Sequence, residues 1–461
     1  MMHAGQVPTV LWFRRDLRLG DLPSLAAAAR EDKEVLACFV FDPRLQMPSG
    51  ARRLRFLCDS LRALRDVLDG RIFITQGKPH ERIPAIAKEI GASAVHVSEE
   101  FTPFGRRRDA AVRAALDDVP LVATGSPYLV SPTRISKPDG TAFRVFTPFY
   151  RRWHESDWRA PAATGAHSAS WIDPGHLDHG IEIPTVDVEL DVEAGETAAL
   201  RRWETFVDAG LERYAKDRNR LDHNATSRMS AHLHAGTIHP RTLVADLDPR
   251  HGGHQAYLRE LAFRDFYASV VHHWPHSAWQ NWNRQFDAMR TESGAAATKA
   301  FECWKAGRTG FPIVDAGMRQ LRATGFMPNR VRMITASFLV KDLHLPWQWG
   351  ARWFMDQLVD GDLANNQHGW QWTAGSGTDA APYFRVFNPV TQGEKFDQDG
   401  DYVRRWVPEL KDVVDVHDLD GNRPRQYPEP IVDHAHERKE ALRRYGLLTS
   451  PTQETKGRAR R

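Results

Sequence analysis

The segment from Asp360 to Trp372 contains more groups capable of chemistry than any other part of this chain. It reads DGDLANNQHGWQW, so two Asp, several carboxamides and two Trp lie close together with almost no aliphatic residues. Carboxamides donate and accept hydrogen bonds whereas Asp only accepts them, and the two Gly permit close backbone approach. These residues suit a flat ligand rich in ring nitrogens and carbonyls. The two indoles could stack on such a ligand or carry electrons to it. The alternative is a polar turn with a capping Asp and a Trp anchor.

A second group lies on one face of a predicted helix. The spacing 0, 3, 7 and 10 places four residues on that face, namely Tyr257, Glu260, Arg264 and Tyr267. A face directed toward a core would carry Leu and Ile, so this aromatic and charged face indicates a binding surface. The alternative is a solvated face on which a Glu–Arg pair at i,i+4 contributes a few tenths of a kcal/mol.

Two further groups lie at predicted helix starts, where free backbone N–H groups and the helix dipole favour an anion. One follows Gly325 and Pro328 and consists of Asn329, Arg330, Arg332 and Met333. The other consists of Tyr214, Lys216 and Arg218, followed by the run Thr226, Ser227, Arg228, Met229 and Ser230. Clustered hydroxyls can hold phosphate oxygens, but helix capping and a core Met are the simpler interpretations.

The spacing of His and Cys does not indicate a metal site. The sequence has no HExxH or CxxC motif, and its paired His lack the i,i+4 spacing of a helical zinc pair. Three scattered Cys are consistent with reduced thiols. We therefore expect no metal.

Composition predicts a soluble cytoplasmic protein of two domains, which we expect to be monomeric. A chain of 461 residues with 41% hydrophobic residues is long enough for two cores. No apolar run approaches a membrane span, and the N-terminus lacks a signal-peptide pattern. The net charge of +3 does not by itself indicate nucleic-acid binding, so any basic patch must be local.

The elements that position these groups change character along the chain. Five segments predict strands that alternate with helices: 8–13, 35–41, 71–76, 94–99 and 121–125. The best helix is 51–69, where Leu at 54, 57, 61, 64 and 68 forms one apolar stripe. The alternation predicts a doubly wound parallel α/β sheet domain, although no GxGxxG or P-loop follows any strand.

We divide the chain into four parts by these patterns. Residues 1–130 form the α/β domain, and 131–195, rich in Pro, Gly, His and Asp, form a connection on the surface. Residues 196–445 show helical periodicity without strand signals and predict a larger all-α domain. Residues 446–461 form a basic tail ending in KGRARR, which we expect to be disordered.

Long motifs of this chain resemble the DNA photolyase and cryptochrome family, most closely the class I cyclobutane pyrimidine dimer photolyases. They are VLWFRRDLRLGD (10–21), TSRMSAHLHAG (226–236), WKAGRTGFPIVDAGMRQLRATGFMPNRVRMITASFLVKDL (304–343), GDLANNQHGWQW and GTDAAPYFRVFNPVTQGEKFD (377–397). The resemblance covers about residues 8 to 410. It implies an antenna domain followed by a helical domain that binds FAD and UV-damaged DNA. Excited reduced FAD would pass an electron to a dimer flipped out of the duplex, and the cyclobutane ring would split.

The resemblance also implies roles for individual residues. For the FAD it implies Tyr214, Thr226, Ser227, Arg228, Met229, Ser230, Tyr257, Arg332, Asp360, Gly361, Asp362 and Asn366. For DNA it implies Arg218, Glu260, Phe263, Arg264, Asn329, Arg330 and Gln392. At the lesion it implies Glu260, Met333 and Trp372 beside the flavin-facing Asn366. The arginines would contact phosphates, which fix register without reading sequence.

Two positions depart from many relatives. Phe263 stands where a lesion-pocket Trp is common, so stacking is retained with a smaller ring. Trp370 and Trp347 match the inner members of the family's electron relay, but the outer Trp is missing from residues 289–303. Three residues could substitute for it: Trp304, Trp279 and Trp282. For Trp304, a place in the core is the simpler alternative.

The resemblance leaves subtype and antenna open. Relatives that repair (6-4) photoproducts have His where this chain has Asn329 or Met333, which favours cyclobutane dimers. A cryptochrome-like blue-light receptor is the alternative from another class, although the chain has only about 50 residues after the motifs. A plain electron-transfer flavoprotein would not need Gln392 or the arginines. The segment VSEEFTPFGRRRD (97–109), with Gly105 where folate binders have Glu, favours a deazaflavin or flavin antenna over folate.

Overall fold

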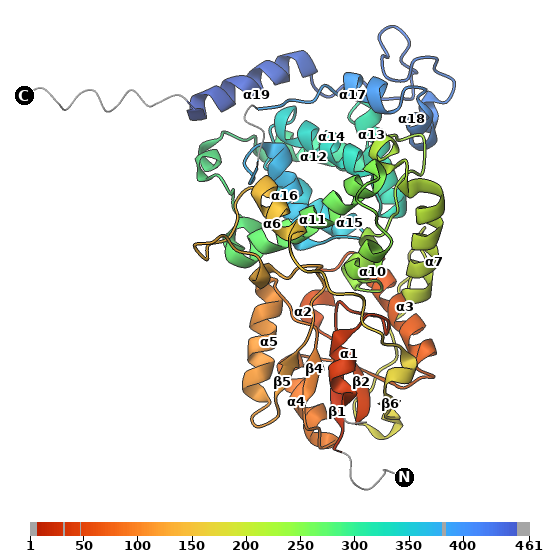
Figure 1. Cartoon of the computed structure of the whole chain (residues 1–461). Helices are drawn as coiled ribbons and strands as arrows, with labels where there is room; N and C mark the ends of the chain where they lie inside the picture. The colour runs from red at the N-terminus through yellow and green to blue at the C-terminus, as the bar shows by residue number, and fades with distance from the viewer. Residues whose placement is uncertain (1–6, 31–32, 47, 380–383, 450–461) are drawn as a thin grey trace, which may run out of the picture.

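The computed structural model describes residues 7–30, 33–46, 48–379 and 384–449. Figure 1 shows a sheet domain at the N-terminal end of the chain and a larger helical domain packed on one end of it. Among the described residues, no helix is both long and apolar enough to cross a membrane.

The sheet domain is built on five parallel strands in the order β3-β2-β1-β4-β5. Their bounds are Thr9–Phe13 (β1), Glu34–Phe41 (β2), Ile72–Gln76 (β3), Val95–Val97 (β4) and Leu121–Ala123 (β5). A short sixth strand, Ser170–Trp171 (β6), pairs in parallel with the start of β2. The five predicted strands and the doubly wound sheet are therefore confirmed.

Helices cover both faces of the sheet, which is why its strands are almost continuously apolar. On one face α1 (Pro23–Ala28) and α3 (Ala51–Val67) pack Leu25 and Leu61 against Leu11. On the other face α4 (Pro79–Glu89) and α5 (Pro103–Ala115) supply a second apolar cluster. The helix α2 (Pro43–Gln46) follows β2. The predicted stripe of helix 51–69 is confirmed, since its Leu residues pack toward the sheet.

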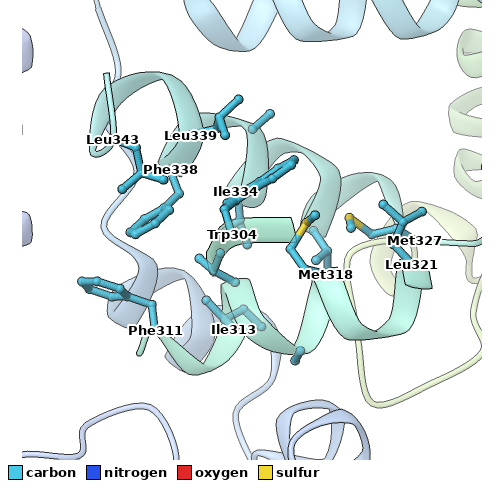
Figure 2. Close-up of a cluster of buried hydrophobic side chains, with 14 of the residues drawn as sticks. Trp304, Phe311, Ile313, Met318, Leu321, Met327, Ile334, Phe338, Leu339 and Leu343 are labelled. Atoms are coloured by element: carbon cyan, nitrogen blue, oxygen red, sulfur yellow. The ribbon is translucent and has the colours of Figure 1, made fainter. Parts of the chain in front are cut away.

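The second domain is helical, as predicted. Its helices are α7 (Glu196–Phe206), α8 (Tyr214–Asp217), α9 (Ser230–Ala235), α10 (Pro240–Ala245), α11 (Gly252–His273), α12 (Gly294–Ala306), α13 (Pro312–Thr324), α14 (Asn329–Lys341), α15 (Trp347–Gln357), α16 (Leu363–Ala374), α17 (Pro389–Phe396), α18 (Asp401–Trp406) and α19 (His434–Thr449). Figure 2 shows part of its core, where Trp304 lies among apolar side chains that include Met318 and Ile334. This core holds α14 and α16 in place.

Two elements differ from the expectation. The connection contains α6 (Phe146–His154), whose Phe146, Phe149 and Trp153 are buried and pack against α11. This part of the connection therefore belongs to the helical core. At the C-terminus α19 continues to Thr449, so the tail expected from residue 446 begins as helix, and residues 450–461 lie outside the described residues.

The loop after β1 joins the two domains. Arg18 donates to the carbonyl of Gly236 at 3.0 Å, and the Asp21 carboxylate accepts from Arg241 at 2.7 Å. Gly236 ends α9 with a left-handed φ of +74°, and a side chain there would collide with the backbone of Arg15. The motif at 10–21 thus sets how closely the domains approach.

Candidate functional site

The two Asp of the 360–372 segment are buried and bound to arginines. Asp360 accepts from Arg332 Nη2 at 2.9 and 3.1 Å. Burial raises the pKa of the Asp360 carboxyl, but the charge and hydrogen bond of Arg332, with a hydrogen bond from Ser230, hold that pKa below its ordinary value. The pair therefore stays ionised and presents fixed charges at the start of α9.

Asp362 has two roles in the structure. It is the N-cap of α16, where Oδ1 accepts from the backbone N–H of Asn365 at 3.1 Å. Its Oδ2 lies 2.8 Å from Arg15 Nη2 and 3.9 Å from His234 Nδ1. Burial raises the pKa of this carboxyl, but the nearby His234 and the charge of Arg15 bring it well below the ordinary value. The capping part of the alternative interpretation is thus correct, and it coexists with a charged site.

Two of these partners were not among the predicted site residues. Arg15 comes from the sheet domain, and His234 lies on α9. Both lie in motifs that carry the family resemblance, but 347 residues separate Arg15 from Asp362. Spacing along the chain gives no signal for such a contact.

The 226–230 run lies beside the same segment. Ser227 Oγ is 2.9 Å from the Tyr257 hydroxyl, and the ring of Tyr214 meets that of Tyr257 edge to face at 5.2 Å. Arg228 has a left-handed φ of +55°, which turns the chain into α9. The structure therefore brings most of the residues expected to hold a cofactor to one region around the start of α9, while Thr226 is half-buried there.

Asn366 lies one turn into α16 and faces α15. Its Nδ2 is 3.0 Å from the Ala351 carbonyl and 3.0 Å from Gln367 Oε1. These contacts fix the amide orientation and leave Oδ1 available as an acceptor.

Arg218 and Glu260, both expected to contact DNA, bind each other beside the ring of Tyr214. Arg218 Nη1 lies 2.5 Å from Glu260 Oε1, and both side chains are about one-third exposed. Burial lowers the pKa of the Arg330 guanidinium, and the charge of nearby Arg218 lowers it further. Arg330 lies over the ring of Phe396 at 4.3 Å and donates to Asn219 Oδ1 at 3.2 Å.

Asn329 and Gln392 complete this side of the domain. Asn329 opens α14 and is exposed, and Gln392 lies half-buried on α17, the helix that ends with Phe396. Residues from α8, α11, α14 and α17 thus surround one partly exposed region with several arginines.

The prediction that Arg264 contacts DNA phosphate is wrong. Its side chain is buried, with 9% of the residue exposed. Nη1 donates to the Pro127 carbonyl at 2.8 Å and Nη2 donates to the Leu233 carbonyl at 3.1 Å. The helical periodicity placed Arg264 correctly on its helix, but the donors bind backbone from two other segments.

Aromatic rings line the surface between Glu260 and α16. Phe263 stacks face to face on Phe146, with centroids 3.5 Å apart, and lies 6.0 Å from Tyr267. Tyr267 stacks on His368 at 5.4 Å. Trp372, one turn after His368, is half-buried and lines a hollow with Lys341, Phe384 and Tyr445. Met333 is also half-buried.

The structure distinguishes among the Trp residues considered for the relay. Trp370 is buried, and its ring meets Trp304 at 6.1 Å and Phe354 at 4.9 Å. Trp304 is 0% exposed and donates to the Thr335 carbonyl at 3.0 Å. Of the three candidates for the outer position, Trp304 is therefore excluded, because an outer member must reach solvent. The core alternative is correct.

The other candidates differ in exposure. Trp347 is buried and donates to Asn281 Oδ1 at 2.9 Å. Trp279 is 61% exposed, whereas Trp282 is half-buried against Trp274. Exposure favours Trp279 over Trp282 as an outer residue. In the described part of the chain, no group of three or more His, Cys, Asp or Glu could hold a metal ion.

Comparison with known proteins relates both domains to one family. A family model described as DNA photolyase matches residues 9–166, and one described as FAD binding domain of DNA photolyase matches residues 257–447. The chain is 37% identical to a deoxyribodipyrimidine photo-lyase of Halobacterium salinarum, over 94% of this chain and 98% of that protein.

Solved structures show the same similarity. A bacterial class III photolyase from Agrobacterium tumefaciens has a TM-score of 0.89 and 35% identity, covering 97% of this chain and 98% of that one. An archaeal photolyase from Sulfolobus tokodaii, solved with two FAD molecules, has a TM-score of 0.85 and 30% identity, covering 96% of this chain and 100% of that one.

Proposed function

Because the chain belongs to the DNA photolyase family, we propose that it repairs cyclobutane pyrimidine dimers in UV-damaged DNA with light. The activity is that of a deoxyribodipyrimidine photo-lyase, which cleaves carbon–carbon bonds. The observation that carries this proposal is the juxtaposition of two regions. Helix α14 links a buried, charged region, where Arg332 binds Asp360, to a partly exposed region, where Arg330 lies near Arg218 and its partner Glu260.

The buried region fits FAD. Asp360 and Asp362 supply acceptors for ring and ribose donors, while Arg332, Arg228 and the Ser230 N-terminus of α9 suit the pyrophosphate. Tyr214 and Tyr257 supply aromatic surface. When bound, reduced FAD supplies the electron that, after excitation, opens the cyclobutane ring and then returns. The protein positions the cofactor against the lesion and supplies the charges around both.

The exposed region fits a flipped lesion. Phe263, Met333 and Trp372 supply apolar walls, and Glu260 and Asn329 supply polar groups for base edges. The region is surrounded by residues that bind the phosphates of the DNA backbone, namely Arg218, Arg330 and Gln392. Glu260 reaches the bases only after it leaves Arg218, so DNA binding and opening of this ion pair are linked.

For the antenna we propose a deazaflavin or flavin rather than a folate. The sheet order changes direction between β1 and β4, which is where open α/β sheets bind ligands. Arg14 follows β1 and binds Asp109 at 2.9 Å, so the 97–109 segment borders this crevice. A Cβ at Gly105 would lie 2.6 Å from Glu100 Oε2 and 2.9 Å from Glu100 Cβ, so the Glu of folate binders would have to displace Glu100. The similar Sulfolobus structure with two FAD molecules supports a flavin.

The test is repair of DNA with cyclobutane dimers by purified protein in blue light and in darkness. We expect dimers to disappear only in light. Repair of (6-4) photoproducts instead would change the substrate, and light-driven flavin reduction without any repair would favour the photoreceptor alternative. Absorption spectra before and after denaturation identify the antenna.

A further inference from the structure

An exposed arginine next to Glu260 rests on three aromatic rings. The guanidinium carbon of Arg259 lies 4.8 Å from the ring centroid of Phe146, 5.4 Å from that of Tyr150 and 5.8 Å from that of Phe263. We call these three rings the aromatic platform. Figure 1 shows α6, which supplies two of them, beside α11, which supplies the third and Arg259 itself.

The aromatic platform is firmly anchored. Phe146 is fully buried and stacks on Phe263 with an interplanar angle of 4°. Below it, Trp153 Nε1 donates to the buried Asp265 at 2.9 Å, which ties α6 to α11. A guanidinium lying on such rings loses little side-chain freedom when it binds a ligand, because its plane is already held.

The charge of Arg259 is not neutralised by an ion pair. None of the described carboxylates lies within ion-pair distance of it, in contrast to Arg218, which Glu260 holds at 2.5 Å. Asp379 is near enough to respond to this charge. Burial raises the pKa of Asp379, and Arg259 partly offsets that rise. Because Arg259 is exposed, its N–H donors can meet a ligand at the surface.

The position of Arg259 identifies the ligand. Phe263 is a wall of the region that receives the lesion in the proposed function, and Glu260 is the next residue along α11. An anion bound by Arg259 therefore lies immediately beside a flipped dimer, where the nearest anions are backbone phosphates. A planar guanidinium with free donors suits two phosphate oxygens at once.

We propose that Arg259, held on the aromatic platform, binds a backbone phosphate of the DNA strand next to the lesion. This inference rests on the proposed function. It adds Arg259 to the residues proposed to bind DNA phosphates, which are Arg218, Arg330 and Gln392. Phe146 and Tyr150 then position the Arg259 guanidinium.

The test compares the Arg259→Gln variant with wild type in binding a dimer-containing duplex at several salt concentrations. We expect weaker binding and a salt slope smaller by roughly one unit, because one fewer counterion is released. Arg259→Lys should keep most of the slope, since it keeps the charge. The matched control is Arg71→Gln, an exposed arginine just before β3. Strand β3 runs parallel to β1, whose C-terminal end leads to the domain boundary, so Arg71 lies at the opposite end of the sheet.

Flavin absorbance and thermal unfolding confirm that each variant is folded. An Arg259→Gln protein with wild-type affinity and slope would overturn the inference, as would equal weakening by Arg71→Gln. Absence of light-dependent repair in wild type would instead defeat the proposed function, while the salt slope still reports whether Arg259 meets DNA.

Discussion

Arg218 and Glu260 form an ion pair with 2.5 Å between Nη1 and Oε1, although each is proposed to contact a different part of the damaged DNA. The pair joins α8 and α11 across the ring of Tyr214, which lies 5.8 Å below the guanidinium. About one-third of each side chain is exposed, so the pair contributes more than a fully exposed one and less than a buried one. Its opening on DNA binding releases both groups for the substrate, whose contacts replace the ion pair.

Glu260→Gln tests this exchange. We expect less repair per absorbed photon with FAD content unchanged, because the carboxylate contact to the bases is lost. We also expect tighter binding to undamaged DNA and a steeper salt slope, because Arg218 is no longer neutralised. Repair yield and fluorescence anisotropy measure the two effects. Unchanged repair would remove Glu260 from the site.

Arg330→Ala should weaken binding of damaged and undamaged DNA alike and reduce the salt slope by roughly one unit. Its guanidinium lies over Phe396 and bonds Asn219, so it is held at the rim of the region. Titrations at several salt concentrations measure the slope. A slope equal to that of wild type would show that Arg330 faces away from DNA.

Asp362→Ala should lose flavin and also stability. The substitution removes the cap of α16, worth about 1 kcal/mol, and leaves the mostly buried Arg15 without its partner, which costs about 3 kcal/mol. Asp362→Asn keeps an N-cap acceptor and separates the effects. We expect it to fold with weaker FAD binding, measured by absorbance after gel filtration. Full flavin content in Asp362→Asn would contradict the assignment.

Trp370→Phe should abolish photoreduction of oxidised FAD while sparing repair by protein that is already reduced. Trp370 is the buried indole on α16, and Gly350 allows its ring to pack directly on α15. Transient absorption after a laser flash measures the electron transfer. Trp279→Phe then tests whether the exposed Trp279 ends the path. Normal photoreduction in Trp370→Phe would exclude the relay.

Acid should destabilise the protein below about pH 6.5. Burial lowers the pKa of His239 to about 3 and those of His232 and His368 to about 4. His239 is held neutral, because Nδ1 accepts from the Arg241 N–H and Nε2 donates to the Ser126 carbonyl. The unfolded chain binds protons on these His below its pKa of about 6.5, whereas the folded chain does not until the pH is far lower.

Stability is therefore complete above pH 6.5 and declines as the pH falls toward 4, by about 2 kcal/mol per such His at pH 5. Urea unfolding at pH 7.5, 6 and 5 measures the decline. His239→Gln should make the decline shallower, whereas the exposed control His436→Gln should not. A pH-independent unfolding free energy would contradict burial of these His in the neutral form.

Local patterns predicted the elements well because their signals lie within one element. The stripe of Leu in 51–69 and the Pro328 breaker before α14 each depend on neighbours a few residues away. The missed helix α6 has a clear stripe, Phe146, Phe149 and Trp153, but it is only nine residues long in a region of Pro and Gly. Its stability comes from packing on α11, which a local pattern does not contain.

The site residues were harder to predict where a side chain meets a distant segment. Arg264 and Arg218 are both arginines near Glu260, yet one binds buried carbonyls and the other faces the surface. Arg15 reaches the site from the other domain. Trp304, the first residue of the WKAG motif, gives no sign in the sequence that the Thr335 carbonyl accepts its N–H. These outcomes depend on tertiary contacts and not on spacing.

The contacts of the loop after β1 also bear on how light is used. Arg15 binds Asp362, Arg18 donates to the Gly236 carbonyl and Arg241 donates to Asp21. These contacts fix the orientation of the sheet domain and its distance from the segment 360–372. If an antenna chromophore occupies the sheet domain, as we propose, excitation passes to the flavin by dipole coupling, which depends steeply on separation and mutual orientation. Ion pairs at the domain boundary thereby set the efficiency of light harvesting, although none of them absorbs light.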